Sequence, residues 1–125
     1  MKRFRFIQTG SASNWWSIAE FRVYNAAPSL LNRSGWSATG SASGSGTTAS
    51  DTLDGSLSTR WTNGYSQANG QWFQVDMGKI QSISSVTLNA ASFTGDYPRG
   101  YAVDLSIDGT NWQRVVTQTG SAANW

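Results

Sequence analysis

Residues 101–107, Tyr101-Ala102-Val103-Asp104-Leu105-Ser106-Ile107, followed at once by Asp108-Gly109, decide the fold of this chain. Tyr101, Val103, Leu105 and Ile107 alternate with smaller or polar residues, which is the pattern of a β-strand with one buried face. An Asp-Gly pair between two such runs is a strong signal for a tight hairpin. The second run follows at Trp112 to Val116. The stretch therefore predicts an antiparallel β-hairpin.

The same alternation recurs along most of the 125 residues. Further strand-like runs cover residues 3–7, 21–24, 71–77 and 86–90, and glycine-rich turns separate many of them. No segment carries a sustained apolar stripe at the helical period. Many short strands joined by turns predict an all-β, antiparallel β-sandwich.

The stretch 40–48 contains only Gly, Ser, Ala and Thr, which is typical of a flexible linker. A linker here would leave a first piece too short to hold a core of its own. We therefore expect residues 1–125 to form a single domain.

The composition narrows the function classes. The chain has no cysteine and no histidine, which excludes disulfides and thiolate nucleophiles and removes the commonest general base and transition-metal ligand. Charged residues make up 13% of the sequence, the net charge is only +2, and there are seven tryptophans. So few charges form no basic stripe for nucleic acid. The expectation is a secreted, neutral-surfaced, aromatic-rich binding module with no enzymatic activity.

Five blocks in order resemble the discoidin domains, which include the factor V and factor VIII C-type domains and the family 32 carbohydrate-binding modules. The blocks are Gly35–Thr39, Leu53–Trp61, Gly70–Gly78, Asp96–Tyr101 and Ser106–Trp112. The resemblance implies a jelly-roll β-sandwich of the galactose-binding-domain type. It also implies a secreted, extracellular, non-catalytic module that attaches an enzyme or surface protein to a polysaccharide or oligosaccharide. The alternatives are an engineered or structural discoidin scaffold and an adhesion module for protein or, less favoured, membrane.

The order of the blocks departs from the family. Residues 3–21 resemble the segment that closes the family domain, but here they open the chain. We therefore expect a circularly permuted domain, with residues 1–25 equivalent to the family's C-terminal segment and 33–125 to its N-terminal part. The permutation would be natural or engineered, and the alternative is a fragment of a tandem array whose boundaries are displaced. Residues 8–15 also recur almost unchanged as residues 118–125. The strand that precedes the closing segment in the family is missing, so an open edge predicts a monomer or a strand-swapped dimer.

The loop from Asp51 to Thr59 is dense in oxygen atoms and contains Gly55 for a tight turn. A hard divalent cation prefers such ligands, so the loop favours structural calcium. The resemblance supplies the ligand set: the Asp54 and Glu20 carboxylates, the carbonyls of Ala19, Asp51 and Ser56, and both oxygens of Thr59. The alternative is an Asx turn with Glu20 as a surface charge.

Aromatic and polar residues in loops predict a sugar site, because sugars stack their C–H faces on rings and bond their hydroxyls to polar side chains. The loop candidates are Asn14, Trp15 and Trp16, then Thr62, Asn63 and Tyr65, then Asp96, Tyr97 and Arg99. Antiparallel strands return alternate loops to one edge, so these three loops should meet there. Trp15 would then provide the stacking face, Tyr65 a wall, and Asp96 and Arg99 the hydroxyl partners.

Other tryptophans are expected in the core, namely Trp61, Trp72 and Trp112, whereas Trp36 fits either place. Galactose-binding relatives carry a His where this chain has Thr62, and an Arg and an Asn near Ser92 and Gly95. The resemblance therefore implies a glucan- or chitosan-like ligand in place of galactose.

Overall fold

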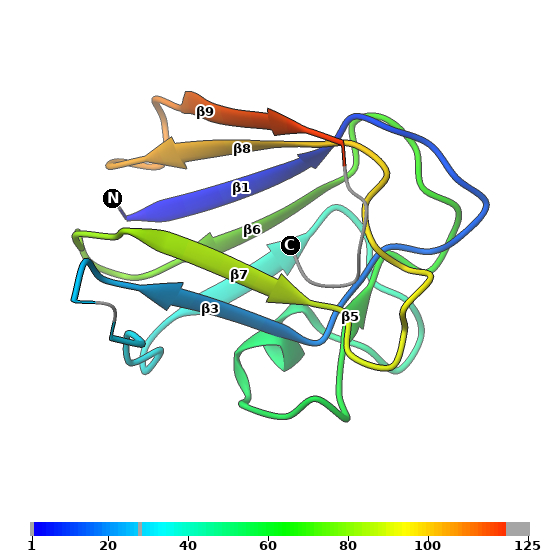
Figure 1. The fold of residues 1–125 in the computed structure, drawn as a ribbon, viewed down its shortest axis with the longest axis horizontal. Coiled ribbons are helices and arrows are strands. Elements are labelled where there is room, and N and C mark those ends of the chain that lie inside the picture. The colour runs from blue at the N-terminus through cyan, green and yellow to red at the C-terminus, as the bar shows by residue number, and fades with distance from the viewer. Residues whose placement is uncertain (1, 28, 120–125) are drawn as a thin grey trace.

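The computed structural model, which describes residues 2–27 and 29–119, is an antiparallel β-sandwich (Figure 1). The larger layer is a five-stranded sheet in the order β4 (Ser37–Gly40), β6 (Trp72–Asp76), β1 (Arg3–Gln8), β8 (Tyr101–Ser106) and β9 (Gln113–Gln118). The second layer pairs β3 (Glu20–Tyr24) with β7 (Ser85–Asn89). Two short strands, β2 (Ser17–Ile18) and β5 (Trp61–Thr62), pair with each other, and a 3-10 helix, η1, covers Ala49–Leu53. Within the described residues, no helix has the length and apolar character needed to cross a membrane.

Strand β1 lies in the middle of the five-stranded sheet, between β6 and β8. Its alternation of aromatic and charged residues sends Phe4 and Phe6 into the core and leaves Arg3 and Arg5 on the other face. Phe6 lies opposite Phe73 of β6 on one side and Val103 of β8 on the other. The first residues of the chain therefore hold the sheet together.

The core is built mainly from aromatic rings. Phe21 of β3 meets Phe4 and Phe6 edge to face, at centroid distances of 5.6 and 5.7 Å. Trp61 is fully buried, and its ring lies 5.2 Å from that of Trp16 at an angle of 80°. Such offset and perpendicular arrangements are the favourable geometries for aromatic pairs.

The core prediction is confirmed for Trp61 and wrong for two other tryptophans. Trp72 and Trp112 are only partly buried. Trp72 precedes the inward-facing Phe73 and so points to the outer face of the sheet, whereas the Trp112 ring is covered by Arg5 at 4.1 Å. Trp36, left open by its sequence context, packs partly buried against the core.

The small-residue stretch 40–48 folds onto the sandwich and is no linker. The backbone N–H of Ser41 donates to Trp72, and that of Gly44 donates to Thr62. The indole N–H of Trp61 donates to the carbonyl of Ala42 at 3.1 Å. A side chain at Gly40 would meet the Trp61 ring at 2.6 Å, so the aromatic ring needs this glycine.

On the outer face of the sheet, one carboxylate joins three strands. Asp104 of β8 accepts from Arg5 of β1 at 3.2 Å and from Arg114 of β9 at 2.9 Å. Burial alone would raise the pKa of Asp104, but the hydrogen bonds from Arg114 and Arg5 outweigh it and hold the pKa below its ordinary value of 3.8.

Asp104→Asn should lower the free energy of unfolding by about 1–3 kcal/mol at neutral pH, because it weakens two charge-assisted bonds. A carboxylate with a lowered folded-state pKa stabilises the protein above its unfolded pKa, and this contribution is lost as the pH falls through the folded value. The difference between wild type and variant should therefore shrink below about pH 4. Urea denaturation across this pH range measures it, and a difference that stays constant would contradict the expectation.

Candidate functional site

Three loops far apart in the sequence meet at the end of the sandwich where β1 ends and β8 begins. They are residues 9–16, 63–71 and 90–100. The first two are joined by a bridge between Ala12 and Gln67, and the first and third by a hydrogen bond from Arg99 to Asn14 at 3.0 Å. The predicted gathering of the loops is thus present in the structure.

Gln67 is the residue that links all three loops. Its side-chain amide donates to the carbonyls of Trp15 at 3.0 Å and Tyr97 at 2.8 Å, and its side-chain oxygen accepts from the backbone N–H of Arg99 at 3.1 Å. Its own backbone N–H donates to Asn14. Because Gln67 is only 2% exposed, these bonds are shielded from water and none of them is easily replaced.

Two glycines allow the first and third loops to cross closely. A Cβ on Gly10 would meet the backbone nitrogen of Gly100 at 2.8 Å, and a Cβ on Gly100 would meet the Thr9 hydroxyl at 2.8 Å. Gly100, the last residue of the Asp-Tyr-Pro-Arg-Gly sequence, therefore has a packing role in positioning the site.

The surface of this loop cluster carries two exposed rings. Trp15 is 43% exposed and Tyr65 is 47% exposed. Arg99 stacks over the Tyr97 ring at 3.7 Å, and both side chains are half-buried. Asn14, which accepts from Arg99, is exposed beside Trp15.

A charged group from a fourth position lies over the Trp15 ring. Arg60 lies 5.9 Å from the Trp15 ring centroid and 3.7 Å from that of Phe93. The same guanidinium pairs with Asp96 at 3.1 Å, and Asp96 also accepts from the Ser17 hydroxyl at 2.6 Å. Asp96 therefore has an internal partner in addition to any hydroxyl that it would bind.

Some of the predicted sugar-binding residues are structural instead. Trp16 is fully buried against Trp61, so its ring has no face for a ligand, and the prediction for Trp16 is wrong. Thr62 and Asn63 are each 1% exposed. The Asn63 side chain accepts from the Trp16 N–H and donates to Gln71, so it is used to hold the loop.

Sequence reasoning missed Gln67, Arg60 and Phe93. Arg60 stands directly before Trp61 in the block Leu53–Trp61, so its position was visible but its contact with Trp15 was not. Gln67 lies in a polar loop where nothing in the residue types distinguishes it from its neighbours.

The residues predicted to hold calcium lie near the start of β3. Glu20 is 1% exposed, and its Oε1 has no hydrogen-bond partner in the described part of the chain. This oxygen lies 3.9 Å from the position that a Cβ on Gly55 would take, so it faces the loop 51–59. Gly55 has a φ of +79°, the left-handed conformation that glycine adopts most readily.

The loop itself is closed by internal hydrogen bonds. The Asp54 carboxylate accepts from the Ser56 N–H at 2.8 Å and from the Thr59 hydroxyl. The Asp51 carboxylate accepts from the N–H of Thr48, which leaves the Asp51 carbonyl for another role. These contacts are those of the alternative Asx turn, although they also gather the oxygen atoms expected of a cation site.

Arg33 provides the Glu20 carboxylate with a positive partner. Its guanidinium donates to Glu20 Oε2 and to the Phe21 carbonyl, the latter at 3.1 Å. Among residues 2–27 and 29–119, no three acidic, histidine or cysteine side chains cluster in a way that would hold a metal. The donor set fits calcium only if carbonyl and hydroxyl oxygens complete it around Glu20 and Asp54.

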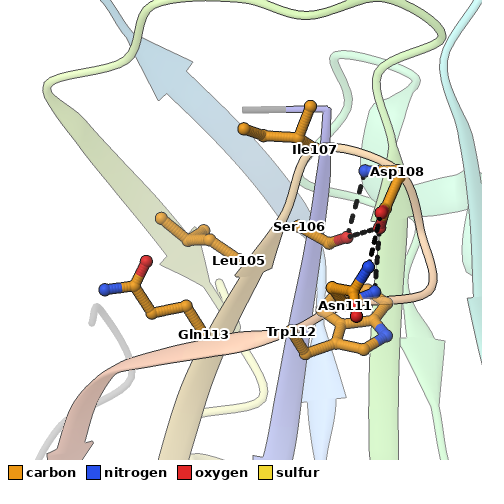
Figure 2. Close-up of a pocket in the computed structure, with 7 residues that line it drawn as sticks. All are labelled: Leu105, Ser106, Ile107, Asp108, Asn111, Trp112 and Gln113. Carbon is orange, nitrogen blue, oxygen red and sulfur yellow. Dashed lines mark hydrogen bonds between the residues drawn. The ribbon is translucent and has the colours of Figure 1, made fainter.

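A hollow of about 260 Å³ lies at the opposite end of β8, under the hairpin loop 107–112 (Figure 2). Its Asp108 carboxylate is used inside the loop, where it accepts from the N–H groups of Thr110 and Asn111 at 2.8 Å. The backbone bonds from Asn111 and Thr110 hold the pKa of Asp108 well below its usual range. The carboxylate therefore organises the turn.

The family model for the F5/8 type C domain matches residues 35–125, and the chain belongs to this family. It is a family of binding modules, typically extracellular, whose ligands include carbohydrates and phospholipids. Neither the curated proteins nor the solved structures contain a match to this chain.

Trp15→Ala and Trp16→Ala should differ sharply in stability, although the two residues are neighbours. Trp15→Ala removes an exposed ring and should leave the melting temperature within about 2 °C. Trp16→Ala opens a cavity in the core and should lower the free energy of unfolding by about 3–5 kcal/mol. Thermal and urea denaturation of both variants test this contrast. Equal losses of stability would contradict the placement of Trp15 at the surface and Trp16 in the core.

Proposed function

We propose that this protein is a non-catalytic carbohydrate-binding module that attaches a secreted enzyme or surface protein to a polysaccharide. The observation that carries the proposal is the meeting of three loops around the exposed ring of Trp15. Figure 1 places these loops together at one end of the sandwich, opposite the turn that joins β8 to β9. An open platform of this kind suits one face of an extended glycan chain.

Each group at the platform has a distinct task. The Trp15 ring stacks on the C–H face of a sugar, and Tyr65 provides a second apolar contact. Asn14, Asp96 and Arg99 exchange hydrogen bonds with hydroxyl groups at the sugar's edge. Because Arg60 contacts the Trp15 ring and Gln67 holds the Trp15 backbone, the platform is formed before the ligand arrives, which limits the entropy lost on binding.

The charges favour a neutral glucan over chitosan. The platform carries two guanidinium groups, Arg60, which pairs with Asp96, and Arg99, which bonds to Asn14, against the one carboxylate of Asp96, so it is net positive. A polymer of protonated amino sugars would meet like charge there, whereas a neutral chain would not.

Trp15→Ala should abolish retention on an insoluble glucan, because it removes the stacking face while the fold persists. Trp112→Ala is the matched control, since this ring lies at the other end of β8 and should leave retention unchanged. A pull-down on insoluble glucan measures both, with chitosan as a second matrix. Retention by Trp15→Ala would contradict the proposed platform, and loss with Trp112→Ala would move the site to the hairpin end.

A glycan array distinguishes the proposal from its alternatives. A scaffold without ligand or an adhesion module for protein or phospholipid would leave the array blank. Binding to anionic vesicles together with a blank array would favour membrane adhesion.

The proposal includes a structural calcium ion held by Glu20, Asp54, Thr59 and the carbonyls of Ala19, Asp51 and Ser56. The buried, unpartnered Oε1 of Glu20 supports it, because a buried carboxylate oxygen without a donor is unfavourable unless a cation or another donor completes its environment. When bound, the ion would tie the loop 51–59 to the start of β3.

Calcium should raise the melting temperature relative to a chelator, since an ion that binds only the folded state stabilises it by about 2.7 kcal/mol at a hundredfold excess over its Kd. Glu20→Gln should remove this response. Arg33→Ala should retain it, because the guanidinium competes with the ion for Glu20. If Arg33→Ala is destabilised and calcium changes no melting curve, the arginines Arg33 and Arg22 balance the charge of Glu20 without an ion and the calcium proposal fails.

A further inference from the structure

The arginines of this protein differ in how their charge is balanced. Within residues 2–27 and 29–119, every arginine but one lies against a carboxylate. The pairs are Arg3–Asp76, Arg5–Asp104, Arg22–Glu20, Arg33–Glu20, Arg60–Asp96 and Arg114–Asp104. The exception is Arg99, which lies in the three-loop platform and bonds to no acidic side chain of the described residues. The positive charge of Arg99 is therefore left for another group to balance.

Arg99 is nevertheless held in place. Its Nη1 donates to the Tyr97 carbonyl, and its Nη2 donates at 3.0 Å to both the Asn14 side-chain oxygen and the Gly95 carbonyl. Its guanidinium also stacks on the Tyr97 ring at 3.7 Å. None of these bonds uses the Nε–H group. Because all the acceptors are uncharged, they fix the guanidinium without neutralising it.

The unbalanced charge lies at the edge of the aromatic platform. Asn14, which accepts from Arg99, directly precedes Trp15 in the chain, and the Trp15 ring is 43% exposed. The bond from Arg99 to Asn14 lies at the exposed surface, so a ligand can reach the guanidinium. The other arginine of the platform, Arg60, is already paired with Asp96 at 3.1 Å. The net positive charge of the platform therefore belongs to Arg99.

The loops do not need this charge to stay together. The buried side chain of Gln67 already binds the backbones of the Trp15, Tyr97 and Arg99 segments. A guanidinium that is fixed among uncharged acceptors loses part of its hydration, and an anion offsets this cost better than a neutral group does. An anionic group on the ligand would supply the missing counter-charge.

We infer that the platform prefers an acidic polysaccharide, whose sugars carry carboxylate or sulfate groups at their edges. The inference rests on the proposed function, because it uses the same platform, and it adds the charge class of the ligand. A sugar that stacks its C–H face on Trp15 turns its substituents outward from the ring, where Arg99 can donate to them. The C6 group is such a substituent, a hydroxymethyl in a neutral glucan and a carboxylate in a uronic acid. A neutral chain still binds through the ring, but it lacks the charge-assisted bond.

The test compares glucans that differ only at C6. Amorphous cellulose and curdlan are used unmodified, with C6 oxidised to the carboxylate, and with C6 sulfated, and binding isotherms of the full chain are measured at low salt. On the glucan that retains the protein, an acidic form should bind about five- to tenfold more tightly than the unmodified form. The form with the larger gain identifies the anionic group. Salt at about 1 M should remove the preference, because it shortens the Debye length to about 3 Å.

Three variants separate recognition by Arg99 from general attraction between a basic protein and an acidic polymer. Arg99→Gln should bind the unmodified and acidic forms equally, and the ratio of the two affinities is the readout, so a change common to both forms cancels. Lys79→Gln removes the same charge from an exposed residue after β6, at the other end of the sandwich, and should keep the preference. Trp15→Ala should bind neither form, because the contact with Arg99 depends on the stacked sugar.

The outcomes distinguish this inference from the proposed function. Equal affinity of the wild-type chain for the unmodified and acidic forms would overturn the inference and leave the proposed function standing. Retention on none of the matrices would contradict the proposed function, and the inference with it. A preference that persists in Arg99→Gln or in Trp15→Ala would be ion exchange by the surface as a whole, and would overturn the inference alone.

Discussion

The buried side-chain amide of Gln67 is the constraint on which the proposed binding end of this protein depends. It binds the backbone of the Trp15, Tyr97 and Arg99 segments at once, and so converts three separate loops into one surface. A solvent-exposed loop can bond its backbone polar groups to water in many conformations. The carbonyls of Trp15 and Tyr97 and the N–H of Arg99 are instead bound by the buried side chain of Gln67. The geometry of the platform is therefore set by main-chain bonds, and the exposed side chains are left to vary with the ligand.

The first strand of the chain has a comparable role for the whole sandwich. β1 lies outside the residues 35–125 that match the F5/8 type C family model, yet it occupies the middle of the sheet and pairs with β6 and β8, which lie inside it. A segment that opens the chain thus completes a sheet formed by the family part. This arrangement supports the proposal that the domain is circularly permuted, because the sandwich requires the strand and not its place in the order.

Much of the fold was predictable because alternation in residues such as Phe4, Phe6, Val103 and Leu105 reports directly which face of a strand is buried. The same argument failed for Trp72 and Trp112, since an aromatic ring is also stable half-buried on the outer face, as the Arg5–Trp112 contact shows. In the site, the meeting of the loops followed from antiparallel topology. The roles of Gln67 and Arg60 could not be predicted, because a single long-range contact leaves no periodic signal in the sequence.

The pair Trp15–Trp16 shows how the core and the site are coupled. Trp16 is held against Trp61 inside the sandwich, and its backbone N–H is bound by Asn63. The next residue along the chain toward the N-terminus, Trp15, must then emerge at a fixed point, with the Arg60 guanidinium between its ring and that of Phe93 in contact range of both. A rigid aromatic loses little conformational freedom on binding when its own backbone is already fixed. In the proposed binding mode the buried tryptophan would therefore contribute to recognition without touching the ligand, by placing the exposed one.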